Sequence, residues 1–147
     1  LWCLVAPFIG KRVNYKKMLV IAAIGDMLSY SSCVLLHYTG FHPAAIVVLE
    51  LSTILDGLTC TLLWIAQAGY IHYTAKPTDP HKKGYYFGLF FAIYGICNLT
   101  SALITSFMLG FFEVVVYFWM LEGLSVVTVL YSLFFIIDVQ KKYGALP

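Results

Sequence analysis

Four long stretches of apolar residues, separated by short polar segments, dominate the chain. They cover residues 18–38, 43–73, 84–109 and 112–137, and each reaches the roughly 20 residues that an α-helix needs to cross a bilayer. A fifth apolar stretch, residues 1–10, is about half that length. The pattern predicts four complete membrane-spanning helices and the last part of another, so we expect the chain to belong to a longer protein.

The apolar stretches also predict the fold class. They lack the alternation of apolar and polar residues that marks the strands of membrane barrels, and lipid-embedded backbone must be satisfied within helices or closed barrels. Composition agrees, because 61% of the residues are hydrophobic and 11% are charged, against about 25% charged in soluble domains. We therefore predict an all-α, polytopic transmembrane helix bundle that forms a single domain over residues 1–147.

The basic residues predict how the helices are oriented. All nine lie in the segments 11–17, 76–83 and 138–142, whereas the segments 39–42 and 109–111 contain none. Loops rich in Lys and Arg remain on the cytoplasmic side of a membrane, or on the matrix side in a mitochondrion. We expect the three basic segments on that side, in the plasma membrane or an endomembrane or, alternatively, in the mitochondrial inner membrane.

The 43–73 helix is expected to carry the most informative polar residues. At 1.5 Å per residue it is about 45 Å long, beyond a hydrocarbon core of about 30 Å, so it must tilt or project from the bilayer. Asp56 lies near the membrane midplane, where an ionisable group is costly and marks a functional candidate. Gln67 follows three turns later on the same face, with Thr53 and Cys60 at neighbouring positions. This polar stripe predicts a water-filled cavity; alternatively, Asp56 and Gln67 join helices by hydrogen bonds worth about 1 kcal/mol.

Three more carboxylic acids, Asp26, Glu50 and Glu122, fall inside predicted spans, and no Lys or Arg accompanies them there. Either they are protonated, because burial favours the neutral acid, or their partners are further helices or bound cations. Asp26 and the mid-helix Glu122 join the candidates for a cavity or proton relay. Glu50 and Glu113 lie nearer the outer interface, where we expect them to be solvated.

Other motifs predict packing and exclude several function classes. Gly84 and Gly88 form G-x-x-x-G, a spacing that allows two helices to approach closely. The four cysteines lie in apolar runs without metal-ligand spacing, and we interpret them as small hydrophobic residues. We find no metal site, cofactor site, phosphate-binding loop or catalytic motif, so we do not expect an enzyme. No continuous basic face predicts nucleic-acid binding, and the expected partners are the lipid bilayer and other membrane proteins or further helices of the same chain.

Two segments resemble a known family. Leu1–Val20, LWCLVAPFIGKRVNYKKMLV, looks like the second helix and the following basic loop of major facilitator superfamily proteins. Residues 57–70, GLTCTLLWIAQAGY, resemble the fourth-helix signature of the Unc-93-like family, W-x-x-Q-G-x-Y, and the matching residues are Trp64, Gln67 and Tyr70. Ala68 departs from the signature, since the family has glycine there. The later stretch KKGYYFGLFFAIYGICNL is similar to the start of the family's fifth helix.

The resemblance implies a place in a larger architecture. The chain would run from part of the second helix to the sixth in the N-terminal six-helix half of a twelve-helix, major-facilitator-type protein. The 43–73 helix would then line the central cavity, and the 84–109 helix would lie where the two halves meet. The 18–38 and 112–137 helices would be peripheral.

Three functions remain open from the sequence. Unc-93-like proteins resemble transporters but act mainly as regulators or escorts of other membrane proteins, including potassium channels, and the resemblance implies such a role first. A second possibility is a proton-coupled carrier of small solutes, in which Asp56 and Glu122 titrate during alternating access between two halves. A third is a structural subunit of a large membrane complex, such as a respiratory assembly.

Overall fold

The computed structural model of the protein describes residues 8, 13–75 and 82–138. These residues form four helices and no strand: α2 (Tyr15–Thr39), α3 (Pro43–Ala75), α4 (Lys83–Phe111) and α5 (Val114–Phe134). Each contains a segment long and apolar enough to cross a membrane. The all-helical, multi-pass membrane class predicted from hydropathy is therefore confirmed, while the stretch 1–10 lies, except for Phe8, outside the described residues.

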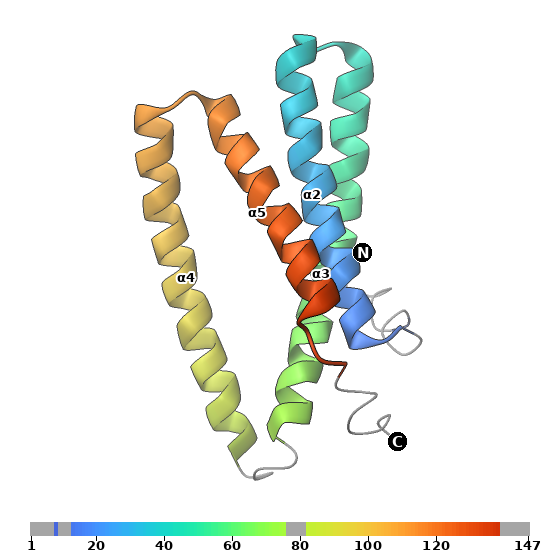
Figure 1. The fold of residues 1–147 in the computed structure, drawn as a ribbon, viewed down its shortest axis with the longest axis vertical. Helices are drawn as coiled ribbons and strands as arrows, with labels where there is room; N and C mark the ends of the chain where they lie inside the picture. The colour runs from blue at the N-terminus through green and yellow to red at the C-terminus, as the bar shows by residue number, and fades with distance from the viewer. Residues whose placement is uncertain (1–7, 9–12, 76–81, 139–147) are drawn as a thin grey trace.

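The helices run up and down, and their turns have local causes. Asn14 caps α2, because its side-chain oxygen accepts a hydrogen bond from the backbone N–H of Lys16 at 3.0 Å. At the other end, Gly40 (φ +62°) and Phe41 (φ +63°) both adopt the left-handed conformation, which turns the chain sharply into α3. In Figure 1 this turn and the α4–α5 turn lie at one end of the bundle, whereas the first residues of α2 and the last of α5 lie toward the other end.

α2 occupies the centre of the arrangement, between α3 and α5. Its interface with α3 is formed mostly by small side chains, and five of the buried residues of α3 recur at seven-residue intervals: Ala45, Ser52, Thr59, Ala66 and Tyr73. Such spacing is typical of helix pairs that wind around each other with left-handed supercoiling. Small residues allow the close approach on which helix association in lipid depends.

Two glycines make the α2–α3 contact possible. A Cβ atom added to Gly25 would overlap the side chain of Thr59, and one added to Gly69 would lie 2.6 Å from the ring of Tyr15. Between these points Met18 packs with Leu62. The helix pair is thus in close contact along the half that begins at Tyr15.

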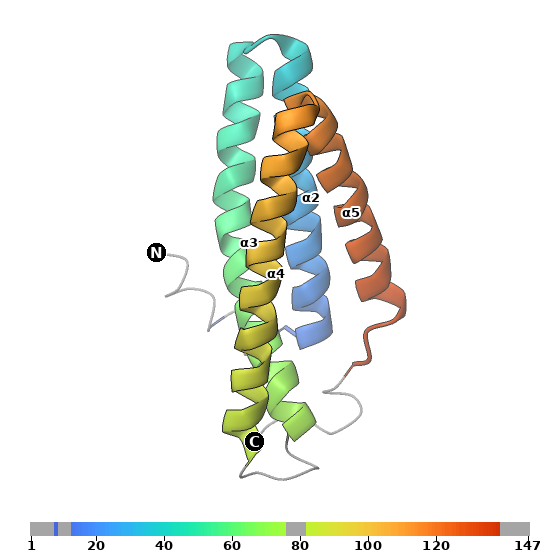
Figure 2. The ribbon, with the colours of Figure 1, turned by 90° about the vertical axis from the view of Figure 1, so that its left-hand side faces the viewer.

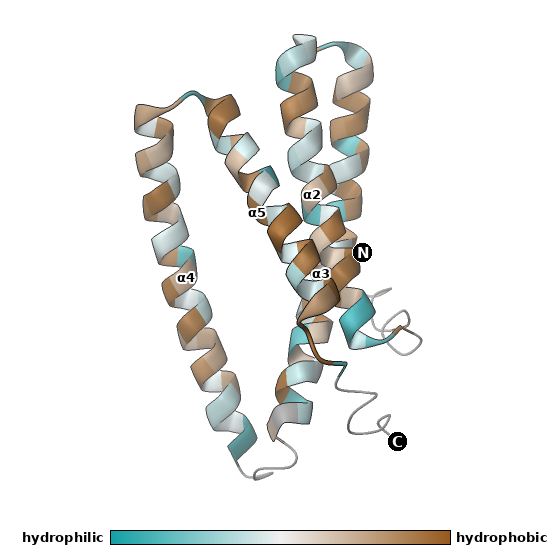
Figure 3. Ribbon diagram, viewed as in Figure 1, coloured by the Kyte–Doolittle hydropathy of each residue, from teal (hydrophilic) through white to brown (hydrophobic). Residues whose placement is uncertain are grey.

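α4 diverges from the other three helices. It has no buried residue, and Figures 1 and 2 show it joined to α3 at one end and to α5 at the other. Figure 3 shows apolar and weakly polar residues distributed along its length, with no continuous hydrophilic stripe. α4 therefore exposes apolar surface, which suits lipid or further helices.

The end of α5 differs from the end of its apolar stretch, which was predicted at residue 137. α5 ends at Phe134, and the chain continues in a non-helical path to Asp138, where the carboxylate accepts a hydrogen bond from the Asn14 amide at 2.5 Å. Tyr70 also donates a hydrogen bond to the carbonyl oxygen of Ile137 at 2.8 Å. These contacts tie the end of α5 to α2 and α3. On this side of the bundle, α3 and α4 extend beyond the ends of α2 and α5 (Figures 1 and 2). The length of the 43–73 stretch had predicted such a projection, or a tilt, for α3.

Candidate functional site

The structure brings two of the intramembrane carboxyl groups together. Asp26 of α2 and Asp56 of α3 face each other across the helix interface, close enough for a hydrogen bond between the two carboxyl groups. Asp26 follows Gly25 in α2, and Asp56 lies one turn before Thr59 in α3. Gly25 and Thr59 mark a point where the two helices approach closely. Two carboxylates in one low-dielectric site repel each other, so this contact is unfavourable while both groups are ionised.

Two tyrosines lie near the pair. The Tyr30 hydroxyl lies within electrostatic range of Asp26, Asp56 and Tyr117, and Tyr117 is hydrogen-bonded to Thr105 of α4 at 3.0 Å. Asp56 Oδ1 is buried and has no hydrogen-bond partner among the described residues. One oxygen of the Asp26–Asp56 pair is therefore buried without a hydrogen-bond partner among the described residues.

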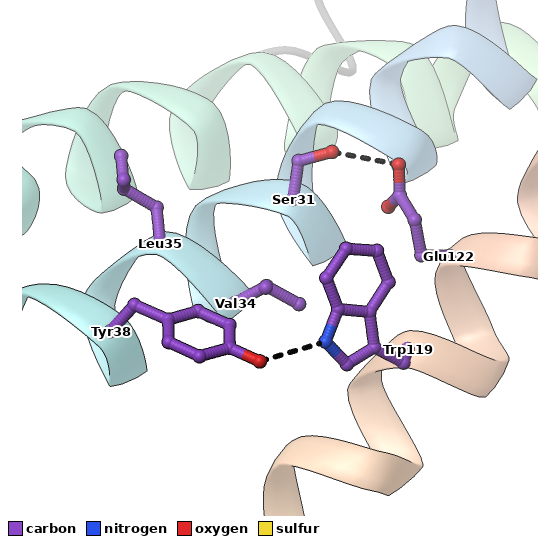
Figure 4. A pocket seen from close by; sticks show the side chains of 6 residues that line it. All are labelled: Ser31, Val34, Leu35, Tyr38, Trp119 and Glu122. Carbon is purple, nitrogen blue, oxygen red and sulfur yellow. Dashed lines mark hydrogen bonds between the residues drawn. The ribbon is translucent and has the colours of Figure 1, made fainter.

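Glu122 forms a separate polar site between α2 and α5. Its Oε1 accepts a hydrogen bond from the Ser31 hydroxyl at 2.8 Å, whereas its buried Oε2 has no partner in the part of the chain that the structure describes. Figure 4 shows this carboxyl group beside Trp119 at a cavity between the two helices. The Glu122 and Asp26–Asp56 sites share α2 but have different partners.

The other predicted polar residues are more dispersed. Glu50 and Glu113 are exposed, and their solvation stays a prediction. Gln67 is partly buried like Asp56, but Thr53 and Cys60 are exposed, and the Thr53 hydroxyl bonds to the carbonyl oxygen of Leu49 at 2.9 Å in its own helix. The stripe expected along α3 is thus divided between its inner side and its outer surface.

The residues of the fourth-helix signature make helix contacts. Trp64 lies against an aromatic group on α4, with its ring centroid 5.0 Å from that of Tyr94 and 6.5 Å from those of Phe90 and Phe91. Tyr70 reaches Ile137 after the end of α5. Two of the three matching residues therefore connect α3 to its neighbours.

The glycine pair of α4 has no such contact. A Cβ atom added to Gly84 or Gly88 would meet nothing within 4 Å. No described residue packs against these two glycines, so the close helix contact predicted from G-x-x-x-G is not formed within the described part of the chain.

Sequence reasoning missed the partners of the carboxyl groups. Ser31 belongs to the mid-helix sequence Ser29-Tyr30-Ser31-Ser32, and its neighbour Ser32 is hydrogen-bonded to Ser52 of α3 at 2.7 Å. Three serines and a tyrosine in the middle of an apolar span could have indicated these partners, because polar side chains in lipid form hydrogen bonds with neighbouring helices.

No metal site emerges from the geometry. Within residues 8, 13–75 and 82–138, no group of three or more His, Cys, Asp or Glu side chains is placed to hold a metal ion. The described sites consist of carboxyl groups and of hydroxyl groups that form hydrogen bonds. Comparison with models of protein families, with curated protein sequences and with solved structures gives no match to this chain.

Proposed function

We propose that this chain is part of an Unc-93-like, major-facilitator-type membrane protein that supports or regulates another membrane protein, and that the surface of α4 not covered by the other half of the protein contributes to that contact. The observation that carries the proposal is the exposure of α4, a helix of 29 residues of which most are exposed and none is buried. Leu99 and Ile96 are each 66% exposed near its middle. A polypeptide packed on this helix would bury apolar side chains that otherwise face lipid.

The roles of the signature residues support this proposal. Trp64 holds α3 against the aromatic residues of α4, and Tyr70 holds it near the end of α5. A side chain fixed between helices is less able to rearrange around a passing solute than one that lines an open cavity. The signature therefore suits the positioning of α4 better than solute binding.

Site-specific photo-crosslinking tests the proposal. A photoreactive amino acid at Leu99 of the full-length protein, irradiated in native membranes, should join α4 to a second polypeptide. Trp64→Ala should lower the yield of this adduct because it removes the aromatic contact that positions α4. Trp119→Ala is the matched control, since Trp119 contacts α2 and its loss should leave the yield unchanged. Adducts with lipid alone, or only within the same chain, would contradict a role through a partner protein.

A proton-coupled carrier is a second candidate, favoured by the Asp26–Asp56 pair. In a carrier, one proton shared by these carboxyl groups would be taken up and released as the surrounding helices rearrange. Asp56→Asn in the reconstituted full-length protein should then abolish uptake driven by a pH gradient. Glu50→Gln, which changes an exposed carboxyl group of the same helix, should leave uptake intact. Uptake that survives Asp56→Asn would exclude the coupling role.

A further inference from the structure

A cavity of about 310 Å³ lies between α2 and α5. Its volume is at the lower end of the range of about 300–1,000 Å³ that is typical of small-molecule pockets. Figure 4 shows the six side chains that line it: Ser31, Val34, Leu35, Tyr38, Trp119 and Glu122. Its walls are mostly apolar, and its polar groups are few and grouped at the two ends.

One end of the cavity offers a hydrogen-bond acceptor. Ser31 orients the Glu122 carboxyl group through Oε1 at 2.8 Å, and the buried Oε2 has no partner among the described residues. The chain cannot supply a Lys or Arg from within its apolar stretches, because all nine basic residues lie in the polar segments. An unpaired buried acceptor is costly, so the site favours a donor from outside the chain.

The other end of the cavity offers an aromatic surface. The Trp119 indole N–H donates to the Tyr38 hydroxyl at 3.4 Å, which uses the polar edge of the indole and leaves its ring available. Trp119 precedes Glu122 by three residues, so the two side chains lie on the same face of α5. An aromatic face near a carboxylate is a combination that binds organic cations.

We propose that this cavity binds a small organic ammonium ion with an apolar body. Because Glu122 Oε2 is buried in the unliganded protein, a rotation of the Glu122 side chain would bring this atom to the cavity surface, where the N–H groups of the ligand would donate to it. The apolar part of the ligand would lie against Val34, Leu35 and the Trp119 ring. A metal ion fits poorly, because hard cations require several oxygen ligands and only one carboxylate lines the cavity. A neutral alcohol would satisfy the acceptor but leave the carboxylate charge without a counter-ion in a low-dielectric site.

The proposal is independent of the role of α4. It depends on α2 and α5 alone, and it holds for a regulator, in which the amine would modulate the protein, as well as for a carrier. Photo-crosslinking from Leu99 therefore does not bear on it.

Equilibrium binding of two matched probes tests the proposal. Radiolabelled 2-phenylethylamine and the neutral 2-phenylethanol share one carbon skeleton and differ in the charged group. The purified full-length protein in detergent should bind the amine saturably and the alcohol at least about ten-fold more weakly, as expected when a buried charge loses its partner. Equal binding of both probes, or no saturable binding of the amine, would overturn the proposal.

Three variants locate the site. Glu122→Gln keeps the side-chain shape and should weaken amine binding by at least about ten-fold. Leu35→Trp fills the cavity without touching the carboxyl group and should also abolish binding. Glu50→Gln removes an exposed carboxyl group elsewhere and should have no effect. If Glu122→Gln fails to fold, Leu35→Trp and the two probes decide the question, and amine binding that survives Leu35→Trp would place the site elsewhere and refute the assignment.

Discussion

Replacement of Gly25 by leucine should separate α2 from α3 and prevent the protein from reaching its folded form. A Cβ atom at this position would lie 2.8 Å from the Cβ atom of Thr59, and no side-chain rotation of Thr59 can move that atom, because it is attached directly to the backbone. Overpacking by single methylene groups costs about 1–3 kcal/mol in protein interiors. Leucine adds four carbon atoms, so the helices must move apart, and the Asp26–Asp56 contact beside Gly25 would be lost with them.

The Gly25 prediction has a control and a reciprocal rescue. Gly95→Leu places the same side chain in α4, where an added Cβ meets nothing within 4 Å, and should change stability little. Gly25→Ala should lower the thermal midpoint in detergent, and Thr59→Gly in the same molecule should restore most of it, because the Cβ atom then moves from one helix to the other. A Gly25→Leu protein that elutes and melts like the wild type would show that the helices are not in close contact here.

Hydropathy was sufficient to predict the four helices. The reason is physical, because lipid leaves an apolar stretch of more than 20 residues almost no alternative to a helix. The end of α5 was less predictable. Phe135, Ile136 and Ile137 are as apolar as the helix before them, yet the chain leaves the helix so that Ile137 and Asp138 can contact Tyr70 and Asn14. The residues that follow the end of α5 therefore contact residues more than 60 positions away in the chain, which hydropathy cannot show.

Part of the α2–α3 interface could also have been predicted. The small residues Ala45, Ser52, Thr59 and Ala66 recur every seven positions in α3, and this spacing marks a helix-packing face. The polar stripe through Asp56 does not mark this face, because it includes Thr53 and Cys60, which the structure leaves exposed. Spacing shows which residues share a face, but it does not show what that face contacts.

The pairing of the carboxyl groups depends on three-dimensional information that the sequence lacks. Asp26 and Asp56 lie 30 residues apart in neighbouring antiparallel helices, so their contact follows from the length of the intervening turn and from helix register. Glu122 and Ser31 are 91 residues apart, and their contact requires that α5 pack on α2 although α4 precedes it in the chain. Candidate residues could therefore be named from the sequence, but their partners could not.

The arrangement also predicts that each helix end can be reached by a membrane-impermeant reagent from only one side of the membrane. Thr39 and Gly110 lie at the last residues of α2 and α4, at one end of the bundle, whereas Lys17 and Lys82 lie at the starts of these two helices, at the opposite end (Figure 1). All four positions are exposed. Two helix ends rich in lysine on the same side agree with the retention of basic segments in the cytoplasm or matrix. A bundle that crosses the membrane four times must therefore place the first two positions together on one side and the last two on the other.

Single-cysteine labelling in sealed membranes tests this arrangement, on which every proposed role depends. With the four native cysteines replaced by alanine, single cysteines at positions 39, 110, 17 and 82 of the full-length protein are exposed to a membrane-impermeant maleimide before and after permeabilisation. In vesicles whose cytoplasmic or matrix face is inside, positions 39 and 110 should react at once, and positions 17 and 82 only after permeabilisation. Labelling of all four from one side, or of positions 39 and 110 from opposite sides, would contradict the four-span arrangement.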